Sequence, residues 1–275
     1  MGTLFLVATP IGNLEDITAR AVRVLGEVRL VAAEDTRQTR KLLSHLEIHT
    51  PLTSYYEHNK LTKLEYILGE LEMGDVALVS DAGTPGLNDP GYELVQAALA
   101  AGHAVSPVPG PNAPVSALVA SGLPTDRFLY LGYLPRKSSE RRRLLEEVQA
   151  LPYTLVFLET PHRLAAALQD LHAVLGDRSA AVARELTKLY EEIRRDTLGN
   201  LAAYYQANPP RGEITLVVAG ASDTPEIWPE VQLEAALQQA LEADEPPSQA
   251  AGRLAAASGW PRRVIYRRLI SMQNQ

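Results

Sequence analysis

The sequence predicts an α/β protein made of two α/β domains and a small helical appendage. Strand and helix patterns alternate over the first 220 residues, and the strand patterns stop after Gly220. The chain has 275 residues, of which 46% are hydrophobic, so it is long enough to bury more than one core. We place the domains at residues 1–114, 115–222 and 223–275.

The first domain begins with a strand-helix-strand unit. "TLFLVA" is typical of a buried strand, and "DITARAVRVLGEV" places Ile17, Ala21, Val24 and Val28 on one helical face before the strand "RLVAAED". The same order returns in "DVALVSDAGTPGLNDPGYELVQAALAAGHAVSPVPGP", where a strand, a glycine-rich loop, a helix and another strand follow one another. This alternation predicts a largely parallel sheet.

The second domain repeats the alternation, and the appendage does not. The strands "RFLYLGYL", "YTLVFLE", "SAAVAREL" and "EITLVVAG" are interrupted by helical stretches, one of which places Leu164, Leu168, Leu171 and Leu175 on a single face. From residue 229 onward the sequence "PEVQLEAALQQALEADEPPSQAAGRLAAASGWPRRVIYRRLISM" predicts three short helices. In "SQAAGRLAAASGWPRRVIYRRL" the turn falls at Gly259, which is the pattern of a helix-turn-helix.

Composition excludes several classes of protein. The chain contains no cysteine, which removes disulfides, thiolate nucleophiles and cysteine-ligated metals. It has no apolar run of membrane-spanning length and no basic lead-in typical of a signal peptide, so we expect a cytoplasmic protein without membrane contact. The dinucleotide fingerprint and the P-loop motif are both missing, and no histidine pattern indicates a metal site.

Three loops rich in glycine and proline follow predicted parallel strands. They are "ATPIGN" at residues 8–13, "SDAGTPGLNDPG" at residues 80–91 and "PVPGPNAPVS" at residues 107–116. Such loops meet at the carboxyl ends of the strands, where parallel sheets bind ligands. Because glycine allows a ligand close to the backbone and proline fixes loop shape, the three predict a rigid pocket lined by backbone, although such turns are often rich in these residues anyway.

Six segments, in this order, resemble the tetrapyrrole-methylase superfamily and, within it, the ribosomal RNA small subunit methyltransferase I family. They are "LFLVATPIGNLEDIT", "VAAEDTRQTRKLL", "SYYEHN", "VALVSDAGTPGLNDPG", "VPGPNAPVSALVASGLP" and "VFLETPHRL". The resemblance implies a class III methyltransferase that transfers a methyl group from S-adenosylmethionine to the 2′-hydroxyl of a cytidine in the decoding region of 16S rRNA. It also implies a homodimer in which two α/β domains hold the donor in a cleft between them, without a metal.

The resemblance also assigns donor contacts to positions of this sequence. In chain order these are Pro10, Asp81, Ala82, Gly83, Gly86, Asn112, Ala113, Glu159 and Leu186. The chain departs from the tetrapyrrole-acting members because it has "SDAGTP" where they have a Gly-Asp-Pro loop, and because it has the "AEDTRQTRKLL" segment and the C-terminal helices. These departures favour RNA as the substrate.

The acidic end of the second strand suggests a catalytic role. Glu34 or Asp35 is our candidate for the proton acceptor or the positioner of the ribose, with Arg37 as a phosphate clamp. Arg40 and Lys41 follow as further candidate RNA contacts. Two alternatives remain open: Asp35 as the N-cap of the helix "TRQTRKLLSHL", and an ordinary network of ion pairs.

Further RNA contacts are predicted where cations and aromatic residues gather. "SYYEHNK" offers Tyr56, His58 and Asn59 for stacking and base contacts, with a dimer or surface role as the alternative. The remaining candidates are Arg136, Lys137, Lys188, Arg262, Arg263 and Arg267. For the C-terminal arginines, the alternative is ion pairing with the acidic "EADE" segment.

Three other function classes compete with this prediction. A small-molecule methylase of the tetrapyrrole type would use the same donor pocket but would not need the basic clusters at residues 136–143 and 262–268. A non-enzymatic RNA-binding module would leave the three glycine- and proline-rich loops without a purpose. A nucleotide-dependent oxidoreductase would need the glycine fingerprint that this sequence lacks.

Overall fold

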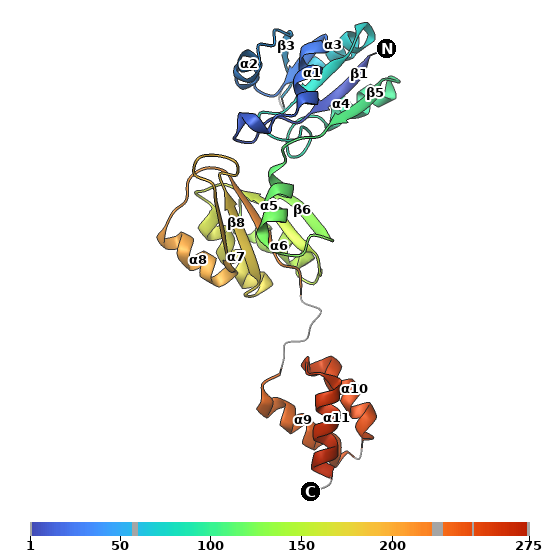
Figure 1. The fold of residues 1–275 in the computed structure, drawn as a ribbon, viewed down its shortest axis with the longest axis vertical. Helices are drawn as coiled ribbons and strands as arrows, with labels where there is room; N and C mark the ends of the chain where they lie inside the picture. Colours follow the sequence, from blue (N-terminus) through green and yellow to red (C-terminus); the bar gives the residue numbers. More distant parts are fainter. Residues whose placement is uncertain (1, 57–59, 222–227, 244, 274–275) are drawn as a thin grey trace. The chain divides into compact units, whose positions relative to one another are not determined.

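The computed structural model describes residues 2–56, 60–221, 228–243 and 245–273. The chain divides into two compact units, residues 1–220 and residues 221–275. The first unit contains two five-stranded sheets and the second is helical (Figure 1). None of the helices in the described ranges is long and apolar enough to span a membrane.

The first sheet is entirely parallel, with strand order β3-β2-β4-β1-β5. Its register pairs Leu4 of β1 and Leu30 of β2 with Val76 of β4, and all three side chains are buried. The elements are β1 (Thr3–Val7), η1 (Leu14–Asp16), α1 (Ala19–Glu27), β2 (Leu30–Ala33), α2 (Thr36–His45), β3 (Leu52–Ser54), α3 (Lys60–Met73), β4 (Val76–Val79), α4 (Tyr92–Ala100) and β5 (Ala104–Val108).

The helices cover both faces of the first sheet. Val24 of α1 and Leu43 of α2 pack with Val7, Val31 and Val79 on one face. On the other face, side chains of α3 and α4 pack with the alternate strand residues; they include Ile67, Leu71, Leu94 and Ala98. The predicted parallel α/β arrangement is confirmed, because a parallel sheet buries both faces and its strands are apolar along their whole length.

The second sheet is mixed, with order β6-β7-β10-β8-β9, and only the β6–β7 pair is parallel. Helices α6, α7 and α8 cover one face, where the four predicted leucines of α7 are all buried. Helix α5 covers the other face. The elements are α5 (Ala113–Ser121), β6 (Phe128–Tyr133), α6 (Ser138–Val148), β7 (Thr154–Glu159), α7 (Leu164–Leu175), β8 (Ser179–Arg184), β9 (Glu192–Thr197), α8 (Leu198–Ala207) and β10 (Ile214–Val218).

The second unit has the three predicted helices, α9 (Glu230–Glu242), α10 (Pro247–Ser258) and α11 (Arg262–Gln273). They share a core of their own, to which Leu237, Leu254 and Leu269 contribute side chains that are almost fully buried. Gly259 ends α10 with φ of +68°, a left-handed conformation that glycine adopts easily, so the predicted turn lies where the sequence placed it.

Candidate active site

The carboxyl ends of β1 and β4 lie side by side in the first sheet. The chain leaves β1 toward β2 on one side of this pair and leaves β4 toward β5 on the other side. Such a reversal opens a crevice beyond the strand ends, where parallel α/β sheets bind their ligands. The loops at residues 8–13 and 80–91 border this crevice, as the sequence predicted.

Hydrogen bonds join these two loops to the third predicted loop. Thr9 and Gly83 exchange two backbone hydrogen bonds, each 2.9 Å long. The Thr84 hydroxyl donates to the carbonyl oxygen of Pro111 at 3.4 Å, and the Asn112 amide donates to the Thr84 hydroxyl at 3.2 Å. Gly83 has φ of +80°, which favours glycine at this point. The three loops therefore form one wall, much of it backbone.

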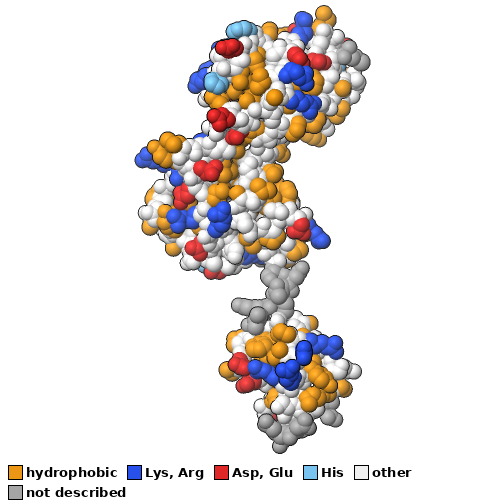
Figure 2. All heavy atoms as spheres, in the orientation of Figure 1, with side chains coloured by type: hydrophobic (Ala, Val, Ile, Leu, Met, Phe, Trp, Pro, Cys, Tyr) orange, Lys and Arg blue, Asp and Glu red, His pale blue; other side chains and the backbone are white. Residues whose placement is uncertain are grey.

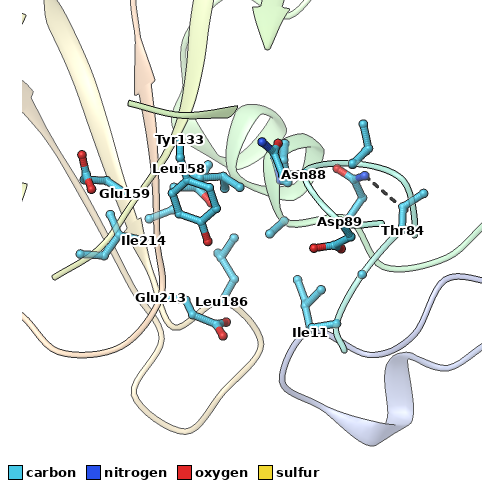
Figure 3. Close-up of a pocket in the computed structure, with 18 of the residues that line it drawn as sticks. Ile11, Thr84, Asn88, Asp89, Tyr133, Leu158, Glu159, Leu186, Glu213 and Ile214 are labelled. Atoms are coloured by element: carbon cyan, nitrogen blue, oxygen red, sulfur yellow. Dashed lines mark hydrogen bonds between the residues drawn. The ribbon is translucent and has the colours of Figure 1, made fainter. Parts of the chain in front are cut away.

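A pocket lies against this wall (Figure 3). Its volume of about 340 Å³ is within the size range of small-molecule sites. Its other side comes from the second sheet. The first loop meets the loop after β8, because a side chain at Gly12 would collide with the carbonyl oxygen of Leu186 and with Lys188. The lining residues include Ile11, Glu34, Thr84, Leu87, Asn88, Asp89, Tyr130, Tyr133, Leu158, Thr160, Glu213 and Ile214.

Most of the predicted donor contacts come together in this pocket. Seven of the nine line it: Asp81, Ala82, Gly83, Asn112, Ala113, Glu159 and Leu186. Pro10 and Gly86 are outside the lining, although their neighbours Ile11 and Leu87 belong to it. Glu159 is buried with its carboxylate already engaged, because it accepts from the Arg163 guanidinium at 3.0 Å and from the Thr160 backbone N–H at 2.7 Å.

The pocket is strongly acidic on the side of the first sheet. The Asp81 backbone N–H donates to Glu34 Oε2 at 3.4 Å, and the Asp35 backbone N–H donates to Asp81 Oδ1 at 2.9 Å. Burial is the main cause that raises the pKa of Glu34 and of Asp81. Burial, together with the charge of Glu34, raises the pKa of Asp89 to about 7. A cationic ligand would relieve this mutual repulsion.

Of the three predicted catalytic residues, only Glu34 lines the pocket. Asp35 is the N-cap of α2, since its carboxylate accepts from the Arg37 backbone N–H at 2.8 Å. The same carboxylate also forms an ion pair with the Arg37 guanidinium at 2.7 Å, and this hydrogen bonding lowers the pKa of Asp35 to about 2. The N-cap alternative is confirmed, and Arg37 projects into solvent beside it.

Two tyrosines and two loop residues of the pocket were missed by the sequence reasoning. Tyr130 and Tyr133 of β6 both line it, although residues three apart in a regular strand face opposite sides. The pairing of β6 with β7 shifts register between them, and Gly132 there has φ of +64°. Tyr130 donates to Asn88 Oδ1 at 2.6 Å, and the Asn88 amide occupies the space that a side chain at Gly132 would need.

The sequence contains a signal for the two loop residues but hardly any for the two tyrosines. Asn88 and the neighbouring Asp89 belong to "LNDPG", a stretch inside the second predicted loop, whereas nothing in "FLYLGY" except its glycine indicates a bulge. Within the described ranges, no three His, Cys, Asp or Glu side chains are arranged to hold a metal ion.

Those predicted RNA contacts that the structure describes lie outside the pocket lining. Arg40 and Lys41 are exposed on α2, and Tyr56 is exposed beside the fully buried Tyr55. His58 and Asn59 lie outside the described residues. Lys188 forms ion pairs with Glu185 at 2.9 Å and Glu213 at 3.1 Å.

The basic cluster at residues 136–143 follows β6, and its cations differ in exposure and in their partners. Arg136 and Lys137 are exposed, and Lys137 pairs with Glu140 at 3.1 Å. Arg141 instead turns inward, where it is buried against Asp170. This part of the cluster is a structural ion pair and offers less exposed charge than the sequence pattern suggests.

In the helical unit, three predicted contacts are exposed on α11: Arg262, Arg263 and Arg267. Arg262 donates to the Ser248 carbonyl at 3.2 Å. The alternative of pairing with "EADE" holds for Arg253, which binds Glu245 at 2.5 Å. Arginine side chains gather on the face of this unit shown in Figure 2.

Comparison with known proteins gives the family. The profile of the Tetrapyrrole (Corrin/Porphyrin) Methylases matches residues 3–202. A relative from Halalkalibacterium halodurans, named ribosomal RNA small subunit methyltransferase I, is 51% identical over 231 residues, which are 82% of this chain and 80% of that protein. A relative of the same name from Synechocystis is 47% identical over 278 residues, 99% of each chain.

Two solved structures share the fold at low sequence identity. Diphthine synthase has a TM-score of 0.62 and 15% identity, and the match covers 80% of this chain and 90% of that one. Uroporphyrin-III-C-methyltransferase from Thermus thermophilus has a TM-score of 0.54 and 21% identity, with 79% and 94% covered. The chain is thus a methyltransferase that belongs to the tetrapyrrole (corrin/porphyrin) methylase family and, within it, to the ribosomal RNA small subunit methyltransferase I family.

Proposed function

We propose that this methyltransferase transfers a methyl group from S-adenosylmethionine to the 2′-hydroxyl of a cytidine in the decoding region of 16S rRNA, acting in the cytoplasm as a homodimer on the small ribosomal subunit. The observation on which the proposal chiefly rests is the acidic, backbone-lined pocket in a chain whose relatives bear the name ribosomal RNA small subunit methyltransferase I. The cytidine and its 2′-hydroxyl come from the family resemblance.

The charge of the pocket suits this donor. S-adenosylmethionine supplies a methyl group on a permanently cationic sulfonium, so the transfer needs no protein nucleophile and no metal. Glu34, Asp81 and Asp89 place negative charge along one wall, where a cation stabilises their ionised forms. Gly83 and Ala113 belong to the wall formed by the loops, which allows a ligand close to the backbone.

The acceptor proposal uses cations that lie outside this acidic wall. Arg37, Arg40 and Lys41 lie in α2, which begins two residues after the pocket residue Glu34. Cations at this place can contact phosphates on either side of a ribose that enters the pocket, while Glu34 in the pocket lining helps to position that ribose. Arg136, Lys137 and the arginines of α11 are available for further phosphate contacts.

The test is a methyl-transfer assay with labelled S-adenosylmethionine and small subunits that lack the modification. The RNA is then digested to nucleosides and analysed by mass spectrometry. The wild type should form 2′-O-methylcytidine. Asp81→Asn should lower the rate about tenfold or more, since it weakens a charged hydrogen bond and a negative charge in the pocket wall. Glu146→Gln is the matched control, because it removes one exposed charge from α6, away from the pocket lining.

Each outcome leads to a definite conclusion. Label in 2′-O-methylcytidine would support the proposal if it depends on Asp81 and not on Glu146. This result would support the proposed donor, the proposed reaction and the role of the pocket together. Label in another nucleoside would contradict the proposed acceptor and keep the RNA substrate. No label in subunits, with label in a porphyrinoid tested in parallel, would replace the proposal with the small-molecule methylase.

A further inference from the structure

Most carboxylates in and beside the pocket already accept a hydrogen bond from a backbone N–H or from a cationic side chain. Glu34 and Asp81 each accept from a backbone N–H. Asp35 and Glu159 are each held by an arginine. Glu213 is held by Lys188. Each such donor stabilises the ionised form of the carboxylate and so makes it a weaker base than it would be without the donor.

Asp89 differs from these groups. Its side chain is hydrogen-bonded to Ser80, and among the described residues no cation and no backbone N–H is recorded as donating to it. The Ser80 hydroxyl is also directed at the carbonyl oxygens of Ala82 and Gly83, both at 3.3 Å. Figure 3 shows the Asp89 carboxylate directed into the pocket, toward the space that Ile11, Leu186 and Tyr133 surround.

The groups that face Asp89 come from three elements. Glu34, directly after β2, and Asp81, after β4, are acids, and their charges oppose ionisation of Asp89. Tyr130 and Tyr133 of β6 stand on the other side, and the phenol of Tyr130 is itself engaged with Asn88. Burial and the two acids raise the pKa of Asp89 to about 7, which is the range in which a general base is most effective.

We propose that Asp89 is the proton acceptor of the methyl transfer, with its carboxylate in direct contact with the ribose hydroxyl. This inference rests on the proposed function. As the bond between the hydroxyl oxygen and the methyl carbon forms, the bond between that carbon and the sulfur breaks, and the sulfur keeps the electron pair. The hydroxyl proton passes to Asp89, so the products are the methyl ether, a neutral thioether and the protonated carboxyl group.

The same geometry couples Asp89 to the donor. A sulfonium cation in the pocket favours the ionised form of a nearby carboxylate and lowers its pKa. Asp89, partly protonated at neutral pH in the free protein, therefore releases its proton when the donor binds. The fraction of Asp89 that can accept a proton is therefore larger when a methyl group is present to be transferred. Glu34 and Asp81 respond less, because each already has a backbone donor.

Calorimetry of donor binding tests this coupling without RNA. Binding of S-adenosylmethionine at pH 7 is measured in two buffers that differ in ionisation enthalpy. The wild type should release up to about half a proton per donor, as expected for a group with pKa near the working pH. S-adenosylhomocysteine, which lacks the sulfonium charge, should release less. Asp89→Asn should bind the donor and release almost none, and its binding also shows that the variant is folded.

The pH dependence of methyl transfer tests the catalytic step. With the donor saturating, the wild-type rate should rise with pH and then level off. Asp89→Asn should be slower by about 10²- to 10⁴-fold, with a flat profile over the same range. Glu34→Gln is the matched comparison from the same wall, and it should keep the sloping profile.

The outcomes separate the two proposals. An Asp89→Asn variant that keeps the sloping profile, or that releases as much proton as the wild type, would overturn the role of Asp89 alone. A Glu34→Gln variant with the flat profile would transfer the role to Glu34. If the wild type methylates neither subunits nor free rRNA, the proposed function fails and the proton acceptor fails with it.

Discussion

Asp89 occupies a position where its charge is unfavourable in the folded protein. Its folded-state pKa of about 7 lies above the usual value for an aspartate, so between about pH 4 and pH 7 the folded state binds more protons than the unfolded state. Stability must therefore fall as the pH rises through this window. The raised pKa that suits Asp89 to accept a proton therefore lowers the stability of the folded state at neutral and higher pH.

Asp89→Asn should consequently stabilise the protein at high pH. We expect its melting temperature to exceed that of the wild type at pH 8 and to approach it at about pH 3.5, where the carboxyl is largely neutral in both the folded and the unfolded wild type. Thermal melts across this range measure the difference, with Glu146→Gln as the exposed-charge control. A gap that stays constant with pH would contradict the raised pKa of Asp89.

Single residues of the site were predictable where a local motif determines them. The N-cap role of Asp35 follows from its place before "TRQTRKLLSHL". A glycine such as Gly83 in the second loop indicates a tight turn, and its φ is indeed positive. Tyr130 and Tyr133 were not predictable, because their common orientation depends on a bulge against β7. A bulge is a property of the pair of strands, and one strand's sequence contains little sign of it.

At the scale of elements, α6 and α7 are held together by a buried network around Asp170. Arg141 Nε donates to its carboxylate at 2.8 Å, Arg142 Nε donates at 2.6 Å, and the Ser138 hydroxyl donates at 2.8 Å. Arg141 also donates to the Pro135 carbonyl at 3.0 Å. Burial opposes the charge of Asp170, but these donors outweigh it and lower the pKa of the carboxyl group.

Asp170→Ala should strongly destabilise the protein, because it leaves the Arg141 guanidinium buried without its carboxylate. Breaking a buried pair in this way costs about 3–5 kcal/mol. Glu147→Ala is the matched control, since Glu147 forms an exposed pair with Arg143 on the same helix at 3.6 Å, and such pairs contribute less than about 1 kcal/mol. Urea unfolding of both variants provides the comparison. Similar losses in the two would show that Arg141 finds other partners.

Elements with periodic patterns were predictable, and those without them were not. The leucines of α7 and the apolar strands β4 and β10 were predicted from the sequence alone. The strand β9 (Glu192–Thr197) has the sequence "EIRRDT", whose charges are typical of a surface loop. It pairs only with β8, at the edge of the sheet, where its charged side chains are partly exposed and find partners, as Glu192 does with Arg184 at 3.1 Å. The short β3 is likewise fixed by pairing with β2 and not by its three residues.

At the scale of the whole molecule, the pocket and the helical unit are separate structures. Every residue that lines the pocket lies within residues 1–220. The helical unit, residues 221–275, has its own core, with Leu233, Leu237 and Ile265 fully buried among its three helices. A small hydrophobic core of this kind stabilises its own helices, so neither unit needs the other's core in order to fold.

This division predicts separable effects on donor and RNA. A chain ending at Gly220 should bind S-adenosylmethionine within about twofold of the full-length affinity, since no pocket residue is removed. Its affinity for small subunits should fall, and the fall should be larger at low salt, because exposed arginines of α11 no longer release counterions from phosphates. Calorimetry measures the first quantity, and binding to subunits at several salt concentrations measures the second.

Point variants of the full-length chain decide whether charge is the cause. Changing Arg263 and Arg267 together to Gln should reproduce much of the loss of subunit affinity and reduce its salt dependence, because both are exposed and have no ion pair recorded within the described residues. Arg253→Gln is the control, since that arginine already pairs with Glu245. If the truncation weakens subunit binding and neither arginine variant does, the helical unit acts through its shape or its apolar surface, and the phosphate contacts must come from the cations of residues 1–220.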